Sequence, residues 1–198
     1  AWGTSLPSST QIQPPSNAGF FFSSGDYRNI TYGKDFVDWY NQSLVTHGKT
    51  VLDAVSSALG TSFANAPLGY KIPGVHWAMT NPSFPRAAEV AAGLVQTSVD
   101  MNAAGTGHGY TKVVGLAKQI STARQVILHF TCLEMSNTYS APAYSGAQDL
   151  VFRVAQHAQS LGVPIKGENA LAGGVATSAG WDNIVNAFDY APYIGLTV

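Results

Sequence analysis

Residues 126–130 read Val-Ile-Leu-His-Phe, an apolar run of strand length that is followed by the polar residue Thr131. A strand with apolar side chains on both faces is typical of a parallel sheet that is covered by helices. Residues 146–161 follow with apolar side chains at helical spacing, and residues 163–166 form another short strand-like run. This order of strand, helix and strand predicts a crossover connection between two parallel strands.

The same alternation extends in both directions along the chain. The predicted elements are helices over 35–59, 110–120 and 181–188 and strands over 68–75 and 193–198. Gly48 falls inside the first of these helices and is a candidate for an interruption. The Pro73-Gly74 pair is expected to redirect the backbone near the end of the first strand. Alternating helices and strands predict the α/β fold class with a parallel sheet.

Two regions differ from this alternation. Residues 1–30 are rich in proline, glycine, serine and asparagine, so we expect an irregular opening segment before the alternating region 31–198. Residues 78–108 form a long connection with a helical piece expected over 86–94, and long connections are often functional. The glycine-rich stretch 105–109 matches neither common phosphate-binding pattern, so we expect a turn there.

Composition excludes several classes of partner. The 198 residues include 10 Lys+Arg and 11 Asp+Glu, and this nearly balanced charge provides no basic surface for nucleic acid. No apolar run reaches the roughly 18 residues of a membrane span, so no membrane partner is expected. The 45% share of hydrophobic residues is enough for a packed core. The single cysteine, Cys132, cannot form an intramolecular disulfide.

Polar or aromatic side chains follow three of the predicted strands. Because reactive groups gather at the carboxyl ends of parallel strands, these residues are expected to share one rim. An imidazole, an indole, a hydroxyl group, an amide and two carboxylates suit a site for a small molecule or a carbohydrate. The residues are His76, Trp77, Thr131, Cys132, Glu134, Glu168 and Asn169.

Several of these side chains, and Lys71 in the first predicted strand, also have a simpler structural interpretation; for Glu168 it is helix capping or ion pairing. His76 and Trp77 are candidates for core packing, and Lys71 for a buried ion pair. Glu134 is expected to hold the loop after the second strand rather than to perform chemistry. Cys132 is expected to be a buried, inert thiol, since His129 and Cys132 lack the second pair of ligands that a zinc site needs.

Three motifs at the predicted strand ends closely resemble those of the family 14 glycoside hydrolases, the beta-amylases. They are Lys-Ile-Pro-Gly-Val-His-Trp at 71–77, Phe-Thr-Cys-Leu-Glu-Met at 130–135 and Gly-Glu-Asn-Ala-Leu at 167–171. The stretches at 1–4, 32–39 and 172–174 are most similar to those of bacterial members.

The resemblance implies a (β/α)8 TIM barrel of which this chain supplies about the second half, strands 5 to 8. Residues 1–198 are then the C-terminal portion of a single catalytic domain, and a missing N-terminal half is the expected structural partner. The general acid of the family lies upstream of the region that Ala1 matches, so we expect it outside this chain. A secreted, extracellular bacterial protein is expected.

The resemblance further implies hydrolysis of α-1,4-glucosidic bonds with release of maltose from non-reducing ends and inversion at the anomeric carbon. Glu168 matches the general base of the family. The positions that match its sugar-binding residues are Lys71, His76, Thr131, Asn169 and Ala170. Starch, maltodextrin and maltose are the expected ligands, with no cofactor and no metal. The alternative is a non-catalytic glucan-binding or inactive fragment, since the chain carries one of the two carboxyl groups that the reaction needs.

Overall fold

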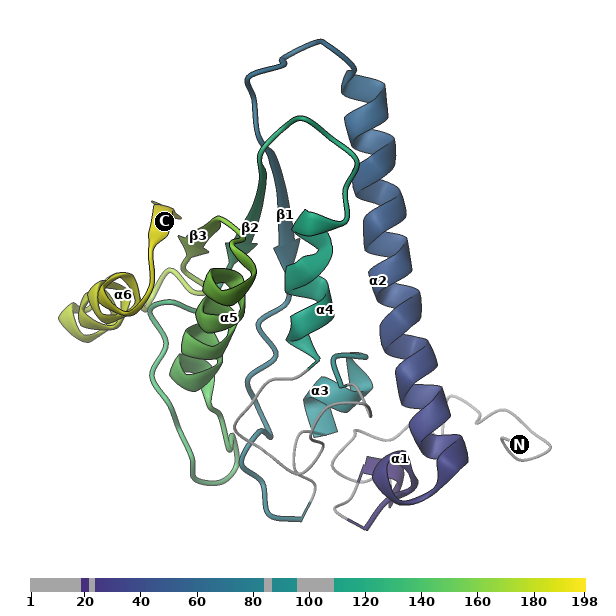
Figure 1. Ribbon diagram of the computed structural model, residues 1–198. Helices are drawn as coiled ribbons and strands as arrows, with labels where there is room; N and C mark the ends of the chain where they lie inside the picture. Colours follow the sequence, from purple (N-terminus) through teal and green to yellow (C-terminus); the bar gives the residue numbers. More distant parts are fainter. Residues whose placement is uncertain (1–18, 22–23, 84–86, 96–108) are drawn as a thin grey trace.

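The computed structural model describes residues 19–21, 24–83, 87–95 and 109–198 of the chain. The chain alternates between helices and strands from α2 onward, which confirms the α/β class (Figure 1). In chain order the elements are η3 (Gly19–Phe21), α1 (Asp26–Asn29), α2 (Thr31–Leu59), β1 (Leu68–Ile72), α3 (Ala87–Ala91), α4 (Tyr110–Val114), η4 (Gly115–Lys118), β2 (Val126–Phe130), α5 (Ala147–Leu161), β3 (Ile165–Glu168), α6 (Ser178–Tyr190) and β4 (Tyr193–Thr197).

The four strands form one parallel sheet in the order β1-β2-β3-β4. Each strand therefore lies beside its neighbour in sequence, which is the arrangement that consecutive βα units of a barrel produce. The register shifts between the last two strands, because Ile165 lies opposite Tyr193 whereas Gly167 lies opposite Leu196. Within the described residues, β1 and β4 are the two edges of this sheet.

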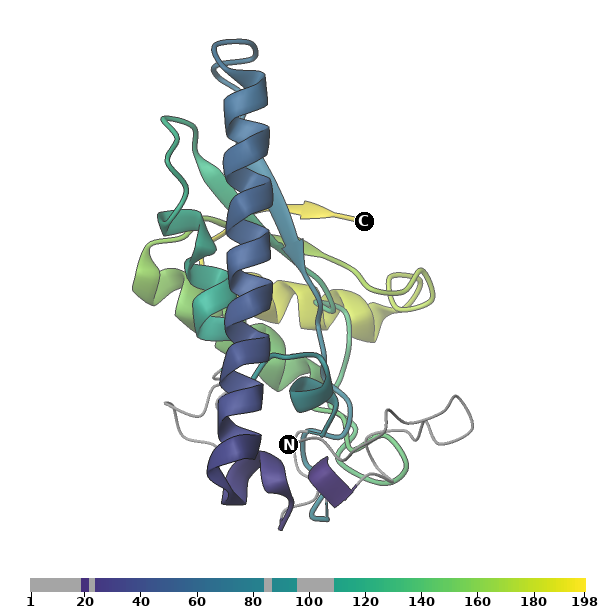
Figure 2. The same ribbon diagram turned by 90° about the vertical axis from the view of Figure 1, so that its right-hand side faces the viewer.

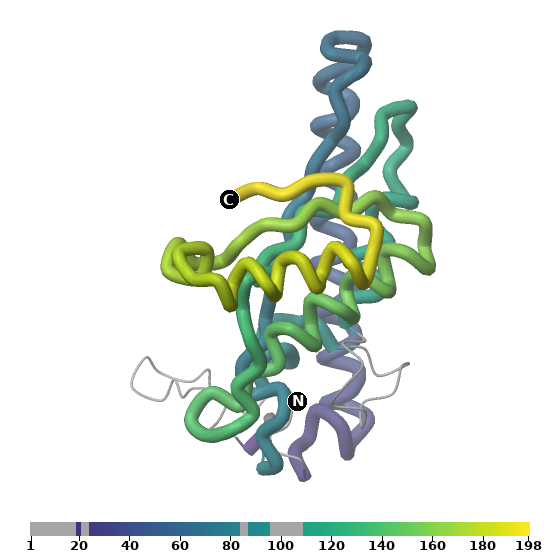
Figure 3. Tube along the Cα trace, turned by 90° about the vertical axis from the view of Figure 1, so that its left-hand side faces the viewer, coloured from purple at the N-terminus to yellow at the C-terminus, as the bar shows by residue number. Residues whose placement is uncertain are grey.

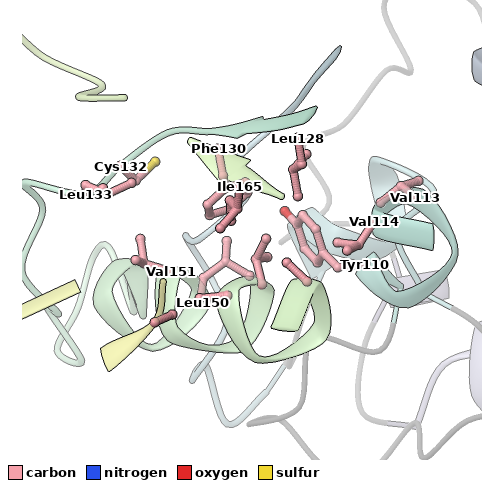
Figure 4. Close-up of a cluster of buried hydrophobic side chains, with 14 of the residues drawn as sticks. Tyr110, Val113, Val114, Leu128, Phe130, Cys132, Leu133, Leu150, Val151 and Ile165 are labelled. Atoms are coloured by element: carbon pink, nitrogen blue, oxygen red, sulfur yellow. The ribbon is translucent and has the colours of Figure 1, made fainter. Parts of the chain in front are cut away.

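Helices α4, α5 and α6 lie on one face of the sheet (Figures 1 and 3). Leu128 and Phe130 of β2 point toward Leu150 and Val151 of α5, and all four side chains are almost completely buried (Figure 4). Tyr110 closes the cluster from α4, and its ring packs edge-on against Phe130. Removal of these apolar side chains from water is the main stabilising contribution to this half of the sheet.

Helix α2 is 29 residues long and lies alongside the sheet for part of its length (Figures 1 and 2). It begins four residues earlier than predicted and continues through Gly48, so the suspected interruption is absent. A Cβ atom at Gly48 would lie 3.0 Å from Cδ1 of Leu116, so the glycine allows α2 to approach η4 closely. The loop that follows α2 is held by Arg124, whose guanidinium donates hydrogen bonds to the carbonyl oxygens of Gly60, Ser62, Phe63 and Ala66.

The first predicted strand is shorter in the structure than the 68–75 that was expected. It ends at Ile72, because Pro73 has no N–H group with which to continue the ladder. The hydroxyl group of Tyr110 replaces the lost pairing: it donates to the carbonyl oxygen of Pro73 over 2.8 Å and accepts from the N–H of Val75 over 2.9 Å. The strand end expected at Pro73-Gly74 is thus confirmed.

The strand predicted over 163–166 lies two residues later, at Ile165–Glu168. Val163 takes part in the cap of α5, which ends at Leu161: its N–H donates to the carbonyl oxygen of Ala158 over 2.8 Å. Glu168 is therefore the last residue of β3, whereas the prediction places it two residues after the strand. Helix α6 begins at Ser178, three residues earlier than predicted, because Oγ1 of Thr177 accepts a hydrogen bond from the N–H of Gly180.

The remaining predictions differ from the structure in smaller ways. The helix predicted over 110–120 consists of α4 followed by the 3-10 turn η4, and the helical piece near 86–94 is α3. The opening segment contains α1, and residues 1–18 of it lie outside the described residues, as do 96–108 of the long connection. In the described part of the chain, none of the helices has both the length and the apolar character that a bilayer crossing requires.

Candidate functional site

Lys71 and Glu168 meet on the face of the sheet opposite α5. The Lys71 Nζ atom lies 2.8 Å from Oε1 and 2.6 Å from Oε2 of Glu168, so the ammonium group bridges both carboxylate oxygens. The lysine comes from β1 and the glutamate from β3, and the contact spans the intervening strand β2. The two side chains are 65% and 24% exposed, so this is an accessible pair rather than the buried ion pair considered for Lys71.

His129 and Lys166 lie on the same face of the sheet, in one row with Lys71. Lys71, His129 and Lys166 are neighbours in register across β1, β2 and β3, so their side chains share one side of the sheet. Glycines provide the space for two of them. A Cβ atom at Gly69 would lie 2.9 Å from Nε2 of His129, and a Cβ atom at Gly195 would lie 2.8 Å from Cε of Lys166.

Burial and neighbouring charges together disfavour the protonated form of His129. Burial lowers the pKa of His129 below its ordinary value of 6.5, and the positive charges of Lys166 and Lys71 lower it further. The carboxylate of Glu168 acts in the opposite direction. A neutral imidazole between two ammonium groups is the arrangement that minimises repulsion within this row.

Glu134 lies in the loop after β2 and is buried, with 4% of its surface exposed. Its carboxylate accepts hydrogen bonds from the N–H of Ala170, at 2.9 Å to each oxygen, and from the N–H of Leu171, at 2.7 Å to Oε1. Both oxygens therefore hold the loop that follows β3. The prediction that Glu134 has a structural role near these loops is thus supported, but the loop that its carboxylate holds is the one after Glu168.

The loop after β1 passes close to the loop after β2. A Cβ atom at Gly74 would lie 2.7 Å from Sγ of Cys132 and 3.0 Å from Cγ2 of Thr131, so only glycine fits there without displacement. Cys132 is buried with a φ of 71°, and burial raises the pKa of its thiol to about 11. Such a thiol is protonated at neutral pH, as expected for an inert cysteine.

His76 lies in the loop after β1 and is half-buried. Its Nδ1 atom lies 2.8 Å from Oγ of the buried Ser145, and its ring packs edge-on against Trp77 at a centroid distance of 5.1 Å. Burial lowers the pKa of His76, whereas the nearby carboxylate of Glu134 raises it. Trp77 itself is 52% exposed, so its indole is not a core side chain.

Asn169 and Ala170 are positioned by their main chains. The N–H of Asn169 donates to the carbonyl oxygen of Thr197 over 3.3 Å, and the N–H of Ala170 is held by Glu134. The carbonyl oxygen of Glu168 accepts from the N–H of Leu133 over 3.4 Å. The segment that carries Glu168 is therefore tied to strand β4 on one side and to the loop after β2 on the other.

The structure thus brings Lys71, Glu168, Asn169 and Ala170 to one rim, with Thr131 and His76 in the adjoining loops. Sequence reasoning missed Lys166, although its spacing of two residues from Glu168 in a strand places both on the same face. It also missed Ser145, for which no sequence pattern exists. Among the described residues, no group of three or more His, Cys, Asp or Glu side chains is arranged to hold a metal ion.

The chain is similar to known proteins over most of its length. The sequence profile of glycosyl hydrolase family 14 matches residues 1–197. The chain is 36% identical to a beta-amylase of Niallia circulans over 201 residues, which cover all of this chain and 31% of that protein. It is 39% identical to a thermophilic beta-amylase of Thermoanaerobacterium thermosulfurigenes over 174 residues, which cover 87% of this chain and 28% of that protein.

A solved structure shows the same arrangement of elements. The crystal structure of the catalytic domain of a beta-amylase from Paenibacillus polymyxa superposes with a TM-score of 0.73 at 34% identity, covering 100% of this chain and 42% of that domain. The chain therefore spans about a third of the curated relatives named above and less than half of this catalytic domain. With a profile match over nearly its whole length, the chain belongs to glycosyl hydrolase family 14, the family of the beta-amylases.

Proposed function

We propose that this chain forms part of a beta-amylase catalytic domain and contributes its general base and part of its sugar-binding rim. The complete domain would hydrolyse α-1,4-glucosidic bonds in starch and maltodextrins and release maltose from non-reducing ends with inversion. An N-terminal half of the barrel, which carries the general acid, would complete the site. The observation that carries the proposal is the accessible carboxylate of Glu168, held by Lys71 near the carboxyl ends of β1 and β3, the two strands that flank β2.

Inverting hydrolysis needs one carboxylate that activates a water molecule and a second carboxyl group that protonates the leaving oxygen. Glu168 suits the first role because it lies on the open face of the sheet and is 24% exposed. Lys71 holds both of its oxygens from one side, which restricts the rotation of the carboxylate. Glu168 would then orient the water for attack and accept its proton as the new C–O bond forms.

The second carboxyl group is expected from the other half of the barrel. Glu134 does not suit the role, since it is 4% exposed and both of its oxygens accept backbone hydrogen bonds. Among the described strands, the face that carries Glu168 holds lysine and histidine but no further Asp or Glu. Roughly 6.5 to 9.5 Å would separate the two carboxyl groups in an inverting enzyme.

The sugar would be bound by hydrogen bonds and by an aromatic face. Lys71, His76, Thr131 and Asn169 offer donors and acceptors around the rim, and Ala170 leaves space for the ring beside Glu168. Trp77, which is 52% exposed, offers a flat apolar surface of the kind on which glucose rings stack. The net charge of −1 suits a neutral glucan better than a charged polymer. An extracellular location remains a prediction of the family resemblance.

The test is Glu168→Gln in the complete catalytic domain, with this chain joined to the N-terminal half of a bacterial beta-amylase. Loss of a general base is expected to lower maltose release on the order of 10² to 10⁴-fold, while maltoheptaose binding changes little. Asp189→Asn, an exposed change on α6, is the matched control and should retain full turnover. Near-normal turnover of the Glu168→Gln protein would contradict the proposed role.

A second candidate function for the chain by itself is glucan binding without hydrolysis. It is favoured by the single accessible carboxylate at the described rim. A reducing-sugar assay of the chain alone, and of the chain mixed with the N-terminal half, separates the two functions. We expect activity only in the mixture, and hydrolysis by the chain alone would show that the general acid does not lie outside it.

A further inference from the structure

We infer that Glu134 is a positioning residue for Glu168, which acts through the backbone of the loop 169–171 and not through contact with the sugar. The inference rests on the proposed role of Glu168 as the general base. Glu134 lies in the loop after β2, and Glu168 is the last residue of β3. The buried carboxylate of Glu134 would fix the direction in which the carboxylate of Glu168 points.

The hydrogen bonds of Glu134 are directed at a short, otherwise exposed stretch of chain. Ala170 and Leu171 are both exposed residues, with Leu171 at 60%, yet their N–H groups converge on a carboxylate that is 4% exposed. Three contacts of 2.7 to 2.9 Å join them. Hydrogen bonds from backbone N–H groups to a carboxylate are charge-assisted and therefore stronger than those between neutral groups.

Glu168 is thus held on both sides by consecutive residues of one loop. Its own carbonyl oxygen accepts from the N–H of Leu133, and the N–H groups two and three residues further on donate to the side chain of Glu134. The backbone of Glu168 is therefore clamped between Leu133 and Glu134. A rotation of the segment 168–171 would break these contacts together, so the clamp restricts the side-chain directions open to Glu168.

Glu134 is itself rigidly placed. Its carbonyl oxygen accepts from Nδ2 of Asn183 on α6 over 3.0 Å, and the same Nδ2 atom lies 2.9 Å from Oγ of Ser136. A Cβ atom at Gly174 would lie 2.2 Å from Cγ of Glu134, so the chain passes directly against the side chain. Because α6 and the backbone at Gly174 leave the side chain of Glu134 few alternative rotamers, its carboxylate can hold the loop 169–171 in one position.

The test compares Glu134→Ala and Glu134→Gln in the complete catalytic domain. Alanine removes the acceptor, and we expect kcat to fall about 10- to 100-fold with KM changed less than about threefold, as for a misplaced catalytic group. Glutamine can place its oxygen where Oε1 accepts both N–H groups, so it should restore most of the lost kcat. A kcat for Glu134→Ala within twofold of the unmodified domain would overturn the inference.

Two further measurements separate positioning from general damage. In a Glu168→Gln background, Glu134→Ala should lower the residual kcat by less than about twofold. If the damage were independent of Glu168, Glu134→Ala would lower kcat by the same factor in both backgrounds. Asp149→Ala is the matched control: its carboxylate accepts hydrogen bonds from Nδ2 of Asn137 at 3.0 Å and from the hydroxyl group of Tyr139 at 2.7 Å, so it holds the loop 137–139 and not the segment 168–171. It should leave kcat unchanged.

Hydrogen exchange provides a readout that does not depend on the reaction. The amides of Ala170 and Leu171 should be protected in the unmodified domain and exchange at least tenfold faster after Glu134→Ala. Unchanged protection would overturn the inference even if kcat fell. If Glu168→Gln retains full turnover, the proposed function fails instead, and the exchange rates still report whether Glu134 clamps the loop.

Discussion

His76 shows how single residues at this rim respond to both solvent and neighbours. Burial disfavours its charged form, while the carboxylate of Glu134 favours it, and burial has the larger effect. Its Nδ1 atom lies within hydrogen-bond distance of Ser145, a neutral side chain. The imidazole is therefore neutral at pH 7, and under the proposed function its other nitrogen would be available to a sugar hydroxyl group.

The lowered pKa of His76 makes stability depend on pH. Because the unfolded chain binds the proton more readily, with a pKa near 6.5, His76 contributes stability above pH 6.5 that is lost as the pH falls through its lower folded pKa. Chemical denaturation at pH 7.5 and pH 5 should therefore show a smaller loss of stability for His76→Gln than for the unmodified protein. An equal acid sensitivity of His76→Gln would contradict the prediction.

At the same scale, sequence reasoning recognised Glu168 from its motif and its place at the end of a strand. It did not predict that Lys71 contacts both oxygens of Glu168. The two residues are 97 positions apart in the sequence, and the strand β2 lies between the strands that carry them. Nor could it identify the partners of Glu134, because backbone N–H groups leave no trace in the sequence. The sequence predicts which residues belong to the candidate site, whereas the contacts between them depend on the register of the strands.

At the scale of elements, the sheet is shaped by glycines that allow close approach. Gly167 of β3 faces the side chain of Leu133, and a Cβ atom there would lie 2.2 Å from Cδ2 of that leucine. Leu133 is 2% exposed and lies in the core cluster, so it has no free space into which to move. The contact sets how closely the loop after β2 approaches the strand that carries Glu168.

Gly167→Ala should therefore destabilise the protein, by about 1–3 kcal/mol, as is typical of an overpacked core. The measurement is the free energy of unfolding from a urea titration. Gly173→Ala is the matched control in the same region, since a Cβ atom there would meet nothing within 4 Å. It should change the stability by less than about 0.5 kcal/mol, as is usual at surface positions. Similar values for the two variants would show that Leu133 yields without cost.

Element boundaries were predicted well where apolar spacing decides them and less well where a cap decides them. The strand Val126–Phe130 and the helix Ala147–Leu161 agree with expectation to within one residue. Strand β3 begins later than predicted because the N–H of Val163 closes the cap of α5, and α6 begins earlier because Thr177 caps it. Such local hydrogen bonds compete with the hydrophobic pattern and are specified by only one or two side chains.

At the scale of the whole molecule, the described sheet has two open edges and one face without covering helices. Side chains of α2 and β1 line a groove of about 430 Å³ that includes Val51, Val55 and Tyr70. Val51 and Val55 are 46% and 41% exposed, which is costly for apolar side chains in water. Two free parallel edges are unusual for a stable sheet, since unpaired N–H and C=O groups invite further pairing.

The proposed barrel predicts how amide exchange at the two sheet edges changes when an N-terminal half is added. In hydrogen exchange, the amides of β2 and β3 should be protected in the chain alone, because each has a strand on both sides. Addition of the N-terminal half of a bacterial beta-amylase should slow exchange at least tenfold in β1 and β4 and leave β2 nearly unchanged. Protection of β1 without β4 would show that the barrel does not close.

The sequence by itself determined the α/β class, the order of helices and strands, the family and the identity of the candidate base, because these depend on periodicity and on short motifs. The tertiary structure decided which charges meet. Lys71 reaches Glu168, His129 lies between two lysines, and the carboxylate of Glu134 is used by backbone N–H groups rather than exposed to a substrate. These outcomes follow from strand register and burial, and both arise only when segments distant in sequence pack against one another.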